Sequence, residues 1–298
     1  MGKLILDYNT YKSETKTSKE EEIFNLVKKQ NSHLIEEYLE KSNDWEALYH
    51  LSPYRGNIIF PCLVSQNDDC LEIGSECGAI TGSILKNSEK LDCIEMSLQQ
   101  SEINFERHKK HELLNIFVGD LFHIAPNLGK KYDKIFIIGA LAKASLYCPN
   151  RDNPYLEMLL NVKKLLKDNG QIFIAMPNKY GMKYFCGAKE DYTGQAFASI
   201  EGFQSREYQT FSSLQLRKML ADAGFKKVYF YYPLPDYKFP NAIYSEDHLP
   251  EMNEITNVYH SLDRERAIVF SEDKALNEAA NAKMFEVFAN SFLVKAGN

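Results

Sequence analysis

The segment Cys70–Ile73 and the glycines that follow it have the residue types of a nucleotide-binding turn. Glu72 lies inside this otherwise apolar run, and Gly74, Gly78 and Gly82 follow at intervals of four. A strand, a glycine turn and a helix start together leave backbone N–H groups free to meet a ligand. Because a buried carboxylate is costly without a partner, we expect Glu72 to be a functional acid rather than part of an exposed edge strand. The glycine spacing differs from the G-x-G-x-x-G fingerprint of dinucleotide-binding proteins.

Two further acids follow the next two apolar runs. Glu95 comes directly after Leu91–Ile94, where its carboxylate is suited to contact two ribose hydroxyls. The structural alternative is a charge at a helix N-terminus, with Ser97 as the cap. Asp120 follows Leu114–Val118 and is placed to accept a hydrogen bond from an exocyclic adenine amine, although Gly-Asp is also common in turns.

Apolar runs alternate with helical periods from residue 69 onward. The predicted strands are Cys70–Ile73, Leu91–Ile94, Leu114–Val118, Lys134–Ile138, Gln171–Met176 and Val228–Tyr232. The predicted helices between them are Ile80–Asn87, Leu98–His111, Pro154–Lys167 and Ser213–Ala223. This alternation predicts βαβ units and an α/β, doubly wound, mostly parallel sheet, with ligands at the carboxyl ends of the strands.

Two irregular segments interrupt the alternation, at about 177–210 and 233–271. Both follow strands at the ligand-binding edge, and long irregular loops in compact domains are usually functional. We therefore expect them to cover the substrate. A last helix is predicted at Lys274–Phe288 and a last strand at Asn290–Val294.

The first 44 residues are predicted to form a helical extension. Residues 1–17 are polar, and we expect them to be loosely ordered. Ser18 and Glu21 fit a capping box for a first helix, Ser32–Lys41 predicts a second, and a third begins near Asp44.

Composition narrows the classes of partner. Of the 298 residues 44% are hydrophobic, and the formal net charge is −6, which argues against nucleic-acid binding through a basic surface. No segment approaches the roughly 18 apolar residues that cross a bilayer, so no membrane partner is expected. The six cysteines have no metal-ligand spacing, and we expect them to be buried thiols of a cytoplasmic protein. His108 and His111, beside Lys109 and Lys110, are interpreted as part of a solvated basic helix face.

The three acids together resemble the cofactor-binding pattern of class I S-adenosylmethionine-dependent methyltransferases. Further motifs are similar to one bacterial branch of that family, associated with surface-polysaccharide biosynthesis, from about residue 45 to the C-terminus. These motifs are Tyr49–Arg55, Leu71–Gly82, Asn178–Tyr184, Glu190–Gly194, Ile200–Gly202 and Tyr231–Pro240. The resemblance implies a methyltransferase domain at residues 45–298, with a seven-stranded sheet whose last strand is antiparallel.

The resemblance also implies where S-adenosylmethionine binds. Glu72, Gly74 and Gly78 would meet its methionine end, Glu95 its ribose and Asp120 its adenine. Further cofactor contacts are expected from Ser75, Met96, Leu121 and, beneath the sulfonium, Gly139. The implied reaction is methyl transfer to a small molecule or to a sugar or glycan precursor.

Four side chains are candidate general bases for that reaction. Methyl transfer needs an aligned acceptor, exclusion of water and, for some acceptors, a base, but no metal. Glu190, Asp191 and Glu201 lie in the first irregular segment and His248 in the second. We expect Glu190 or Asp191 to lie nearest the acceptor, because a branch-specific motif surrounds them.

Departures from the family pattern leave alternatives open. Glu76 stands where the family usually has glycine, and a non-glycine residue at positive φ costs roughly 1–2 kcal/mol. Ala142 and Lys143 replace an acid and an aromatic, and Tyr192 replaces a histidine. One alternative is a weakened or inactive module of a larger polysaccharide-assembly protein. Another is a nicotinamide dehydrogenase, which the glycine spacing disfavours.

Overall fold

The computed structural model describes residues 1–9, 17–148, 152–204, 207–256 and 264–298. These residues form two compact units. Unit 1 comprises Met1–Ile137 and Lys164–Gly170, and unit 2 comprises Ile138–Lys163 and Gln171–Asn298.

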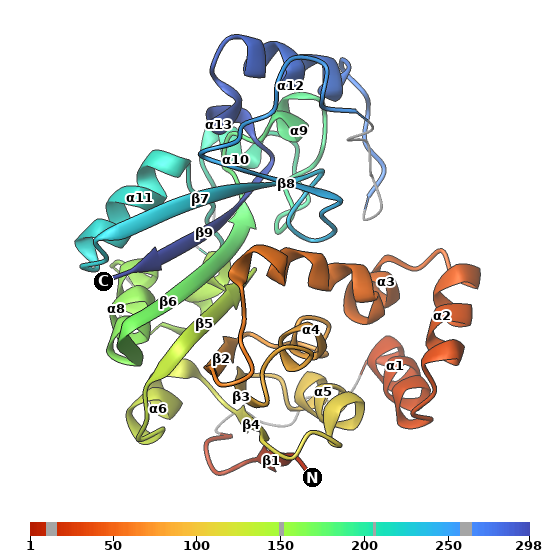
Figure 1. The fold of residues 1–298 in the computed structure, drawn as a ribbon. Coiled ribbons are helices and arrows are strands. Elements are labelled where there is room, and N and C mark those ends of the chain that lie inside the picture. The colour runs from red at the N-terminus through yellow and green to blue at the C-terminus, as the bar shows by residue number, and fades with distance from the viewer. Residues whose placement is uncertain (10–16, 149–151, 205–206, 257–263) are drawn as a thin grey trace. The chain divides into compact units, whose positions relative to one another are not determined.

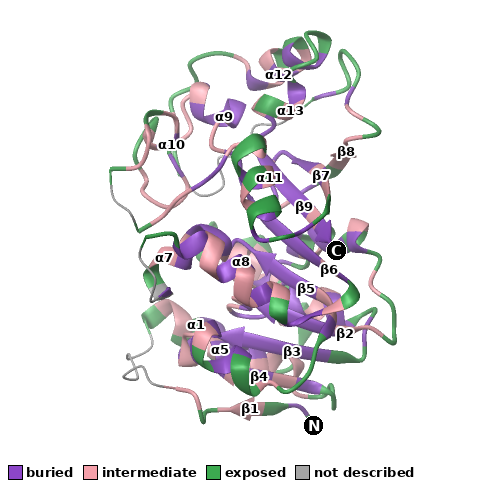
Figure 2. Cartoon of the chain, turned by 90° about the vertical axis from the view of Figure 1, so that its left-hand side faces the viewer, coloured by how far each residue is buried: buried purple, intermediate pink, exposed green. Residues whose placement is uncertain are grey.

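The strands of unit 1 pair in parallel. Their order is β1-β4-β3-β2-β5, so β2 is a central strand (Figure 1). Strands β2 and β3 are buried almost throughout (Figure 2), as expected for strands covered on both faces. The bounds are β1 (Lys3–Ile5), β2 (Asp69–Ile73), β3 (Lys90–Glu95), β4 (Leu114–Val118) and β5 (Tyr132–Ile138).

The helices of unit 1 pack against one another as well as against the strands. Ile23 and Val27 of α1 share a buried apolar cluster with Ile103 of α5 and with Cys77, which follows β2. The helix α1 therefore supports the segment after β2. The bounds are α1 (Ser18–Lys28), α2 (Ser32–Lys41), α3 (Trp45–Leu51), the 3-10 helix η1 (Pro53–Cys62), α4 (Thr81–Leu85), α5 (Leu98–His108), α6 (Leu121–Ile124) and the 3-10 helix η2 (Ala125–Asn127).

The strands of unit 2 pair in antiparallel fashion. Strand β9 lies between β6 and β7 and runs against both, and β8 pairs with β7. The bounds are β6 (Leu166–Pro177), whose first residues belong to unit 1, β7 (Lys227–Leu234), β8 (Ala242–Ser245) and β9 (Ser291–Gly297). Parallel βαβ units followed by this late antiparallel strand confirm the predicted α/β, Rossmann-like fold with an antiparallel last strand. The described residues form nine strands rather than the seven predicted, because β1 and β8 add to the two edges.

The helices of unit 2 lie in the connections between its strands. Helices α9, α12 and α13 gather at one end of the unit (Figure 1). The bounds are the 3-10 helix η3 (Leu141–Lys143), α7 (Ala144–Tyr147), α8 (Pro154–Lys164), α9 (Met182–Phe185), α10 (Ala198–Glu201), α11 (Ser213–Asp222), α12 (Glu272–Asn281) and α13 (Phe285–Phe288).

The N-terminal segment differs from its prediction. Lys3–Ile5 is a strand paired with β4 rather than loosely ordered, and residues 10–16 lie outside the described residues. The capping box of α1 is formed one residue earlier than predicted. Thr17 Oγ1 accepts from Glu20 N at 3.1 Å, and Glu20 Oε2 accepts from Thr17 N at 2.9 Å. This position satisfies two amide donors of the first turn.

Several helix predictions were too long, including Ile80–Asn87 and Leu98–His111, which end at Leu85 and His108. The predicted helix Lys274–Phe288 is divided into α12 and α13, because Lys283 has a φ of +59°, outside the right-handed helical region. The helix from Pro154 ends at Lys164, since Leu166 begins β6. Among the described residues, no helix has both the length and the apolar character to cross a membrane. All six cysteines are buried free thiols, as predicted.

Candidate functional site

The loop after β2 is built on left-handed backbone. Gly74 and Gly78 have φ values of +76° and +79°, which glycine adopts readily. Between them Glu76 has a φ of +47°. The strain predicted for a non-glycine residue at this position is therefore present, at roughly 1–2 kcal/mol.

Close packing of α5 is a second reason for glycine at Gly78 in this loop and at Gly82 in α4. A Cβ on Gly78 would lie 2.2 Å from Asn104 Oδ1, and a Cβ on Gly82 would lie 2.7 Å from His108 Cε1. His108 Nε2 lies 2.9 Å from Gly78 O, and burial lowers the pKa of His108 to about 3. His108 is therefore a neutral donor to the loop. Its interpretation as part of a solvated basic face was wrong, whereas His111 is exposed.

Glu72 is a buried acid in the central strand β2, 2% exposed. Its Oε2 accepts from Thr81 Oγ1 at 2.5 Å and from Cys93 Sγ at 3.5 Å. Asn104 Nδ2 donates in turn to Thr81 Oγ1 at 3.0 Å. Burial raises the pKa of Glu72 to about 8, so this carboxyl is mostly protonated at neutral pH.

The Glu95 carboxylate joins the loop to the start of α5. Its Oε2 accepts from Glu76 N at 2.8 Å, and its Oε1 accepts from Ser97 N at 2.9 Å. Ser97 Oγ caps α5 by accepting from Gln100 N at 3.3 Å. Glu95 therefore has the structural role given as the alternative, a charge at the N-terminus of a helix that Ser97 caps. A carboxylate oxygen can also accept a hydrogen bond from a ribose hydroxyl.

Asp120 caps α6 at the end of β4. Its Oδ1 accepts from His123 N at 3.0 Å, and its Oδ2 is hydrogen-bonded to His123 Nδ1. The neighbouring Leu121 is buried, and Met96, after β3, is half-buried. The hydroxyl oxygen of Ser75, in the loop after β2, is buried without a hydrogen-bond partner.

Glu76 faces an arginine whose role the sequence did not reveal. Arg55 Nη1 lies 4.0 Å from Glu76 Oε2, and the Arg55 side chain is 2% exposed. Its guanidinium carbon stacks 3.7 Å from the centre of the Tyr49 ring, and Nη1 donates to Tyr49 O at 3.1 Å. Tyr49 and Arg55 are the two ends of the Tyr49–Arg55 motif, and that motif was the feature of the sequence that could have pointed to Arg55.

In unit 2, two lysines and two aspartates form a buried ion cluster. Lys183 Nζ lies 2.8 Å from Asp191 Oδ2 and 2.6 Å from Asp236 Oδ2. Lys238 Nζ lies 2.8 Å from Asp191 Oδ1 and 3.1 Å from Asp236 Oδ1. Burial alone would raise the pKa of Asp191, but the two lysines outweigh it and hold that pKa well below its usual range. Asp191 is therefore a weak base.

Glu190 differs from its neighbour Asp191. Its Oε2 accepts from Tyr192 N at 2.9 Å and from Thr193 N at 2.7 Å, while its Oε1 is buried without a hydrogen-bond partner. Burial raises the pKa of Glu190. Of the two predicted acids, Glu190 is the better proton acceptor.

Both irregular segments of unit 2 reach Gly139, directly after β5. Gly139 has a φ of +80°, and a Cβ there would lie 3.2 Å from Tyr237 Oη. Tyr192 Oη donates to Gly139 O at 3.4 Å, and its ring stacks on Tyr208 with 5.4 Å between centroids. Tyr192 belongs to the first segment and Tyr237 to the second, so the two segments meet beside this glycine.

The other two candidate bases lie outside the ion cluster. Glu201 is exposed at the end of α10. His248 is exposed in the turn after β8, where its backbone N donates to Ser245 O at 3.0 Å.

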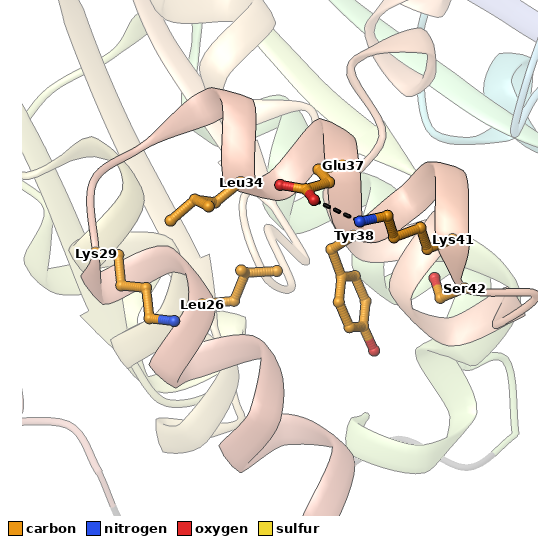
Figure 3. A pocket seen from close by; sticks show the side chains of 7 residues that line it. All are labelled: Leu26, Lys29, Leu34, Glu37, Tyr38, Lys41 and Ser42. Carbon is orange, nitrogen blue, oxygen red and sulfur yellow. Dashed lines mark hydrogen bonds and ion pairs between the residues drawn. The ribbon is translucent and has the colours of Figure 1, made fainter.

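A shallow pocket lies between α1 and α2, apart from the loop after β2 (Figure 3). An ion pair between Glu37 and Lys41, at 2.5 Å, crosses one side of it. Its lining residues are Leu26, Lys29, Leu34, Glu37, Tyr38, Lys41 and Ser42. In the described part of the chain, no group of three or more His, Cys, Asp or Glu side chains could hold a metal ion.

Comparison with known proteins finds a local sequence similarity. No family model matches the chain. Over 116 residues it is 33% identical to ribosomal RNA small subunit methyltransferase A of Borrelia garinii and 32% identical to that of Borreliella afzelii. Each match covers 38% of this chain and 41% of the relative, so the chain spans less than half the length of the curated relatives it matches. The expectation that nucleic acid is not a partner is therefore not supported.

Solved structures give a distant likeness. A SAM-dependent methyltransferase from Archaeoglobus fulgidus has a TM-score of 0.49 at 14% identity, over 84% of this chain and 94% of that one. A possible histamine N-methyltransferase from Thermotoga maritima has a TM-score of 0.45 at 14% identity, over 92% and 99%. Haemonchus contortus phosphoethanolamine N-methyltransferase 1 has a TM-score of 0.48 at 14% identity, over 91% and 49%.

Proposed function

We propose that this chain is an S-adenosylmethionine-dependent methyltransferase. The observation that carries the proposal is the loop after β2, where positive-φ Gly74 and Gly78 flank a backbone N–H that the Glu95 carboxylate holds from the next strand. This geometry places an acid and positive-φ glycines at the carboxyl ends of adjacent parallel strands. The local similarity to ribosomal RNA methyltransferases supports the same class.

The residues of unit 1 fit such a cofactor in most respects. The buried Ser75 hydroxyl lacks a partner, and leaving such a group unbonded costs about 1–3 kcal/mol, so a ligand atom at the loop would stabilise it. We propose that Glu72, Gly74, Ser75 and Gly78 hold the methionine end. The other proposed contacts are Glu95 and Met96 to the ribose and Asp120 and Leu121 to the adenine. Glu76 does not fit the cofactor, because its carboxylate would lie in the same loop as the cofactor's carboxylate, which has the same charge.

Residues of unit 2 are proposed to position the acceptor. S-adenosylmethionine supplies an electrophilic methyl group. Tyr192 and Tyr237 beside Gly139 would exclude water and align the acceptor. Glu190, with its raised pKa, would take a hydroxyl proton more readily than Asp191. Glu201 and His248 remain candidate bases on exposed surface.

A sugar or glycan precursor is the acceptor we propose, in the cytoplasm. Its support is the resemblance of the motifs at residues 178–202 and 231–240 to the polysaccharide-associated branch. RNA is the second candidate, because the local relatives are ribosomal RNA methyltransferases. The net charge of −6 weighs against RNA. We also propose that residues 1–44 are an extension of a methyltransferase domain at 45–298.

The test is transfer of tritiated methyl from S-adenosylmethionine to a panel of sugar nucleotides and to structured RNA. We expect label in at least one sugar nucleotide, and less label with Glu190→Gln. Label in RNA alone would establish the second candidate instead. Cofactor binding without label in either class would favour the alternative of a catalytically inactive module.

A further inference from the structure

The strained residue Glu76 and the buried residue Arg55 form an ion pair within the proposed cofactor loop. Arg55 is fixed on two sides, by the face of Tyr49 and by the Tyr49 carbonyl. Its Nη1 lies 4.0 Å from Glu76 Oε2. The Arg55 side chain is almost wholly buried, whereas 21% of the Glu76 side chain is exposed. A partly exposed carboxylate beside a buried, prearranged cation is the partner that can move.

The backbone does not require glutamate at this position. Glu76 has a φ of +47°, where glycine would be unstrained. Its backbone N–H is held by the Glu95 carboxylate whatever side chain it carries. Strained residues that a protein could avoid are informative about function. The side chain of Glu76, rather than its backbone, is therefore the feature to explain.

We propose that the Glu76 carboxylate occupies the position beside Arg55 that the carboxylate of the cofactor's methionine end takes when it binds. Glu76 is thus an internal competitor for Arg55. The inference rests on the proposed function, because it assumes that the methionine end meets this loop. Through this competition Glu76 is a specificity-determining residue, because it weakens the binding of adenosyl ligands that have an amino-acid carboxylate. Ligands without that carboxylate do not compete for Arg55, and their binding does not depend on the charge at Glu76.

The experiment is calorimetric titration of the full chain with two ligands that differ at this point. S-adenosylhomocysteine has the amino-acid end, whereas 5′-methylthioadenosine has the same adenosine and a thioether without it. Glu76→Gln removes the competing charge and keeps a side chain at positive φ, and Glu76→Gly also removes the strain. Glu112→Gln, at an exposed acid outside the loop, is the matched control.

We expect Glu76→Gln to tighten S-adenosylhomocysteine binding by roughly 3- to 5-fold, the upper range of a single partly exposed charge interaction. Glu76→Gly should tighten it at least as much. Both variants should bind 5′-methylthioadenosine within about twofold of the unaltered chain, as should Glu112→Gln. Thermal melting of each variant checks that it is folded, and Glu76→Gly, which relieves strain, keeps the test open if Glu76→Gln does not fold.

Two results would overturn the inference and leave the proposed function intact. In one, all proteins bind both ligands and neither Glu76 variant changes the affinity for S-adenosylhomocysteine. In the other, Glu76→Gln and Glu76→Gly weaken that affinity, as they would if Glu76 paired with the ligand ammonium. If neither the unaltered chain nor any variant binds either ligand at millimolar concentration, the proposed function fails together with the inference.

Discussion

The charge of Glu72 depends on burial in a central strand more than on residue type. Its Oε2 receives bonds from Thr81 and Cys93, yet these do not offset the loss of solvent around the carboxylate. A protonated Glu72 can donate a hydrogen bond, and an ionised one can bind an ammonium group. The loop after β2 is therefore sensitive to pH in the neutral range.

Glu72→Gln should remove a pH dependence of stability. The pKa of Glu72 rises from 4.5 to about 8 on folding, so the folded state binds the proton more tightly than the unfolded state. This stabilisation is complete below pH 4.5 and is lost as pH rises toward 8. Between pH 6 and 8 the free energy of unfolding of the unaltered chain should fall by about 2 kcal/mol relative to Glu72→Gln, at about 1.4 kcal/mol per pH unit. Urea unfolding at both pH values measures it, and parallel pH profiles would contradict the assigned pKa.

At the scale of elements, the loop after β2 and helix α5 depend on each other. His108 and Arg107 of α5 bond to the carbonyls of Gly78 and Cys77, at 2.9 Å and 2.7 Å. The glycine pattern therefore serves helix packing, a role that was not predicted from the sequence.

Gly78→Ala compared with Gly129→Ala separates packing from backbone strain. Both glycines have positive φ, +79° and +64°, but a Cβ meets Asn104 Oδ1 at 2.2 Å only at Gly78, and at Gly129 it has nothing within 4 Å. We expect a loss of about 1–2 kcal/mol at Gly129 and a further 1–3 kcal/mol at Gly78. Equal losses in urea unfolding would show that α5 does not constrain the loop.

The ion cluster joins α9 of the first irregular segment to the chain after β7. Lys183→Met should destabilise unit 2 by about 3–5 kcal/mol, because it leaves Asp191 and Asp236 buried with one cation instead of two. The matched control is Lys218→Met, which breaks an exposed pair with Asp222 at 2.6 Å and should cost less than about 1 kcal/mol. Similar small losses for both variants would mean that the cluster does not hold the two segments.

At the scale of the whole molecule, apolar patterning was sufficient to predict the core strands. Strand β4 was predicted to the residue, and β2, β3 and β5 to within two residues, because buried parallel strands are continuous apolar runs. Strands β1 and β8 were missed, since short strands carry too little pattern to stand out from loops. The break at Lys283 was missed because no glycine or proline marks it.

The sequence predicted the positions of the acids in the candidate site but not their hydrogen-bond and ion-pair partners. Glu72, Glu95 and Asp120 were found from their positions at strands. Apart from the His123 side chain, three residues after Asp120, their partners lie elsewhere in the sequence or come from backbone. In the ion cluster, Lys183 meets Asp236 across 53 positions. No local spacing reports such contacts, so the weak basicity of Asp191 and the pairing of Arg55 with Glu76 required the structure.

The central claim, that the loop after β2 binds S-adenosylmethionine, is tested most directly by calorimetric titration of the chain with that cofactor. The account predicts saturable binding at one site per chain. It also predicts that Glu95→Gln weakens binding by roughly tenfold, because the amide loses a charged acceptor for the ribose hydroxyls. Absence of binding at millimolar cofactor, for both the unaltered chain and Glu76→Gly, would contradict the claim.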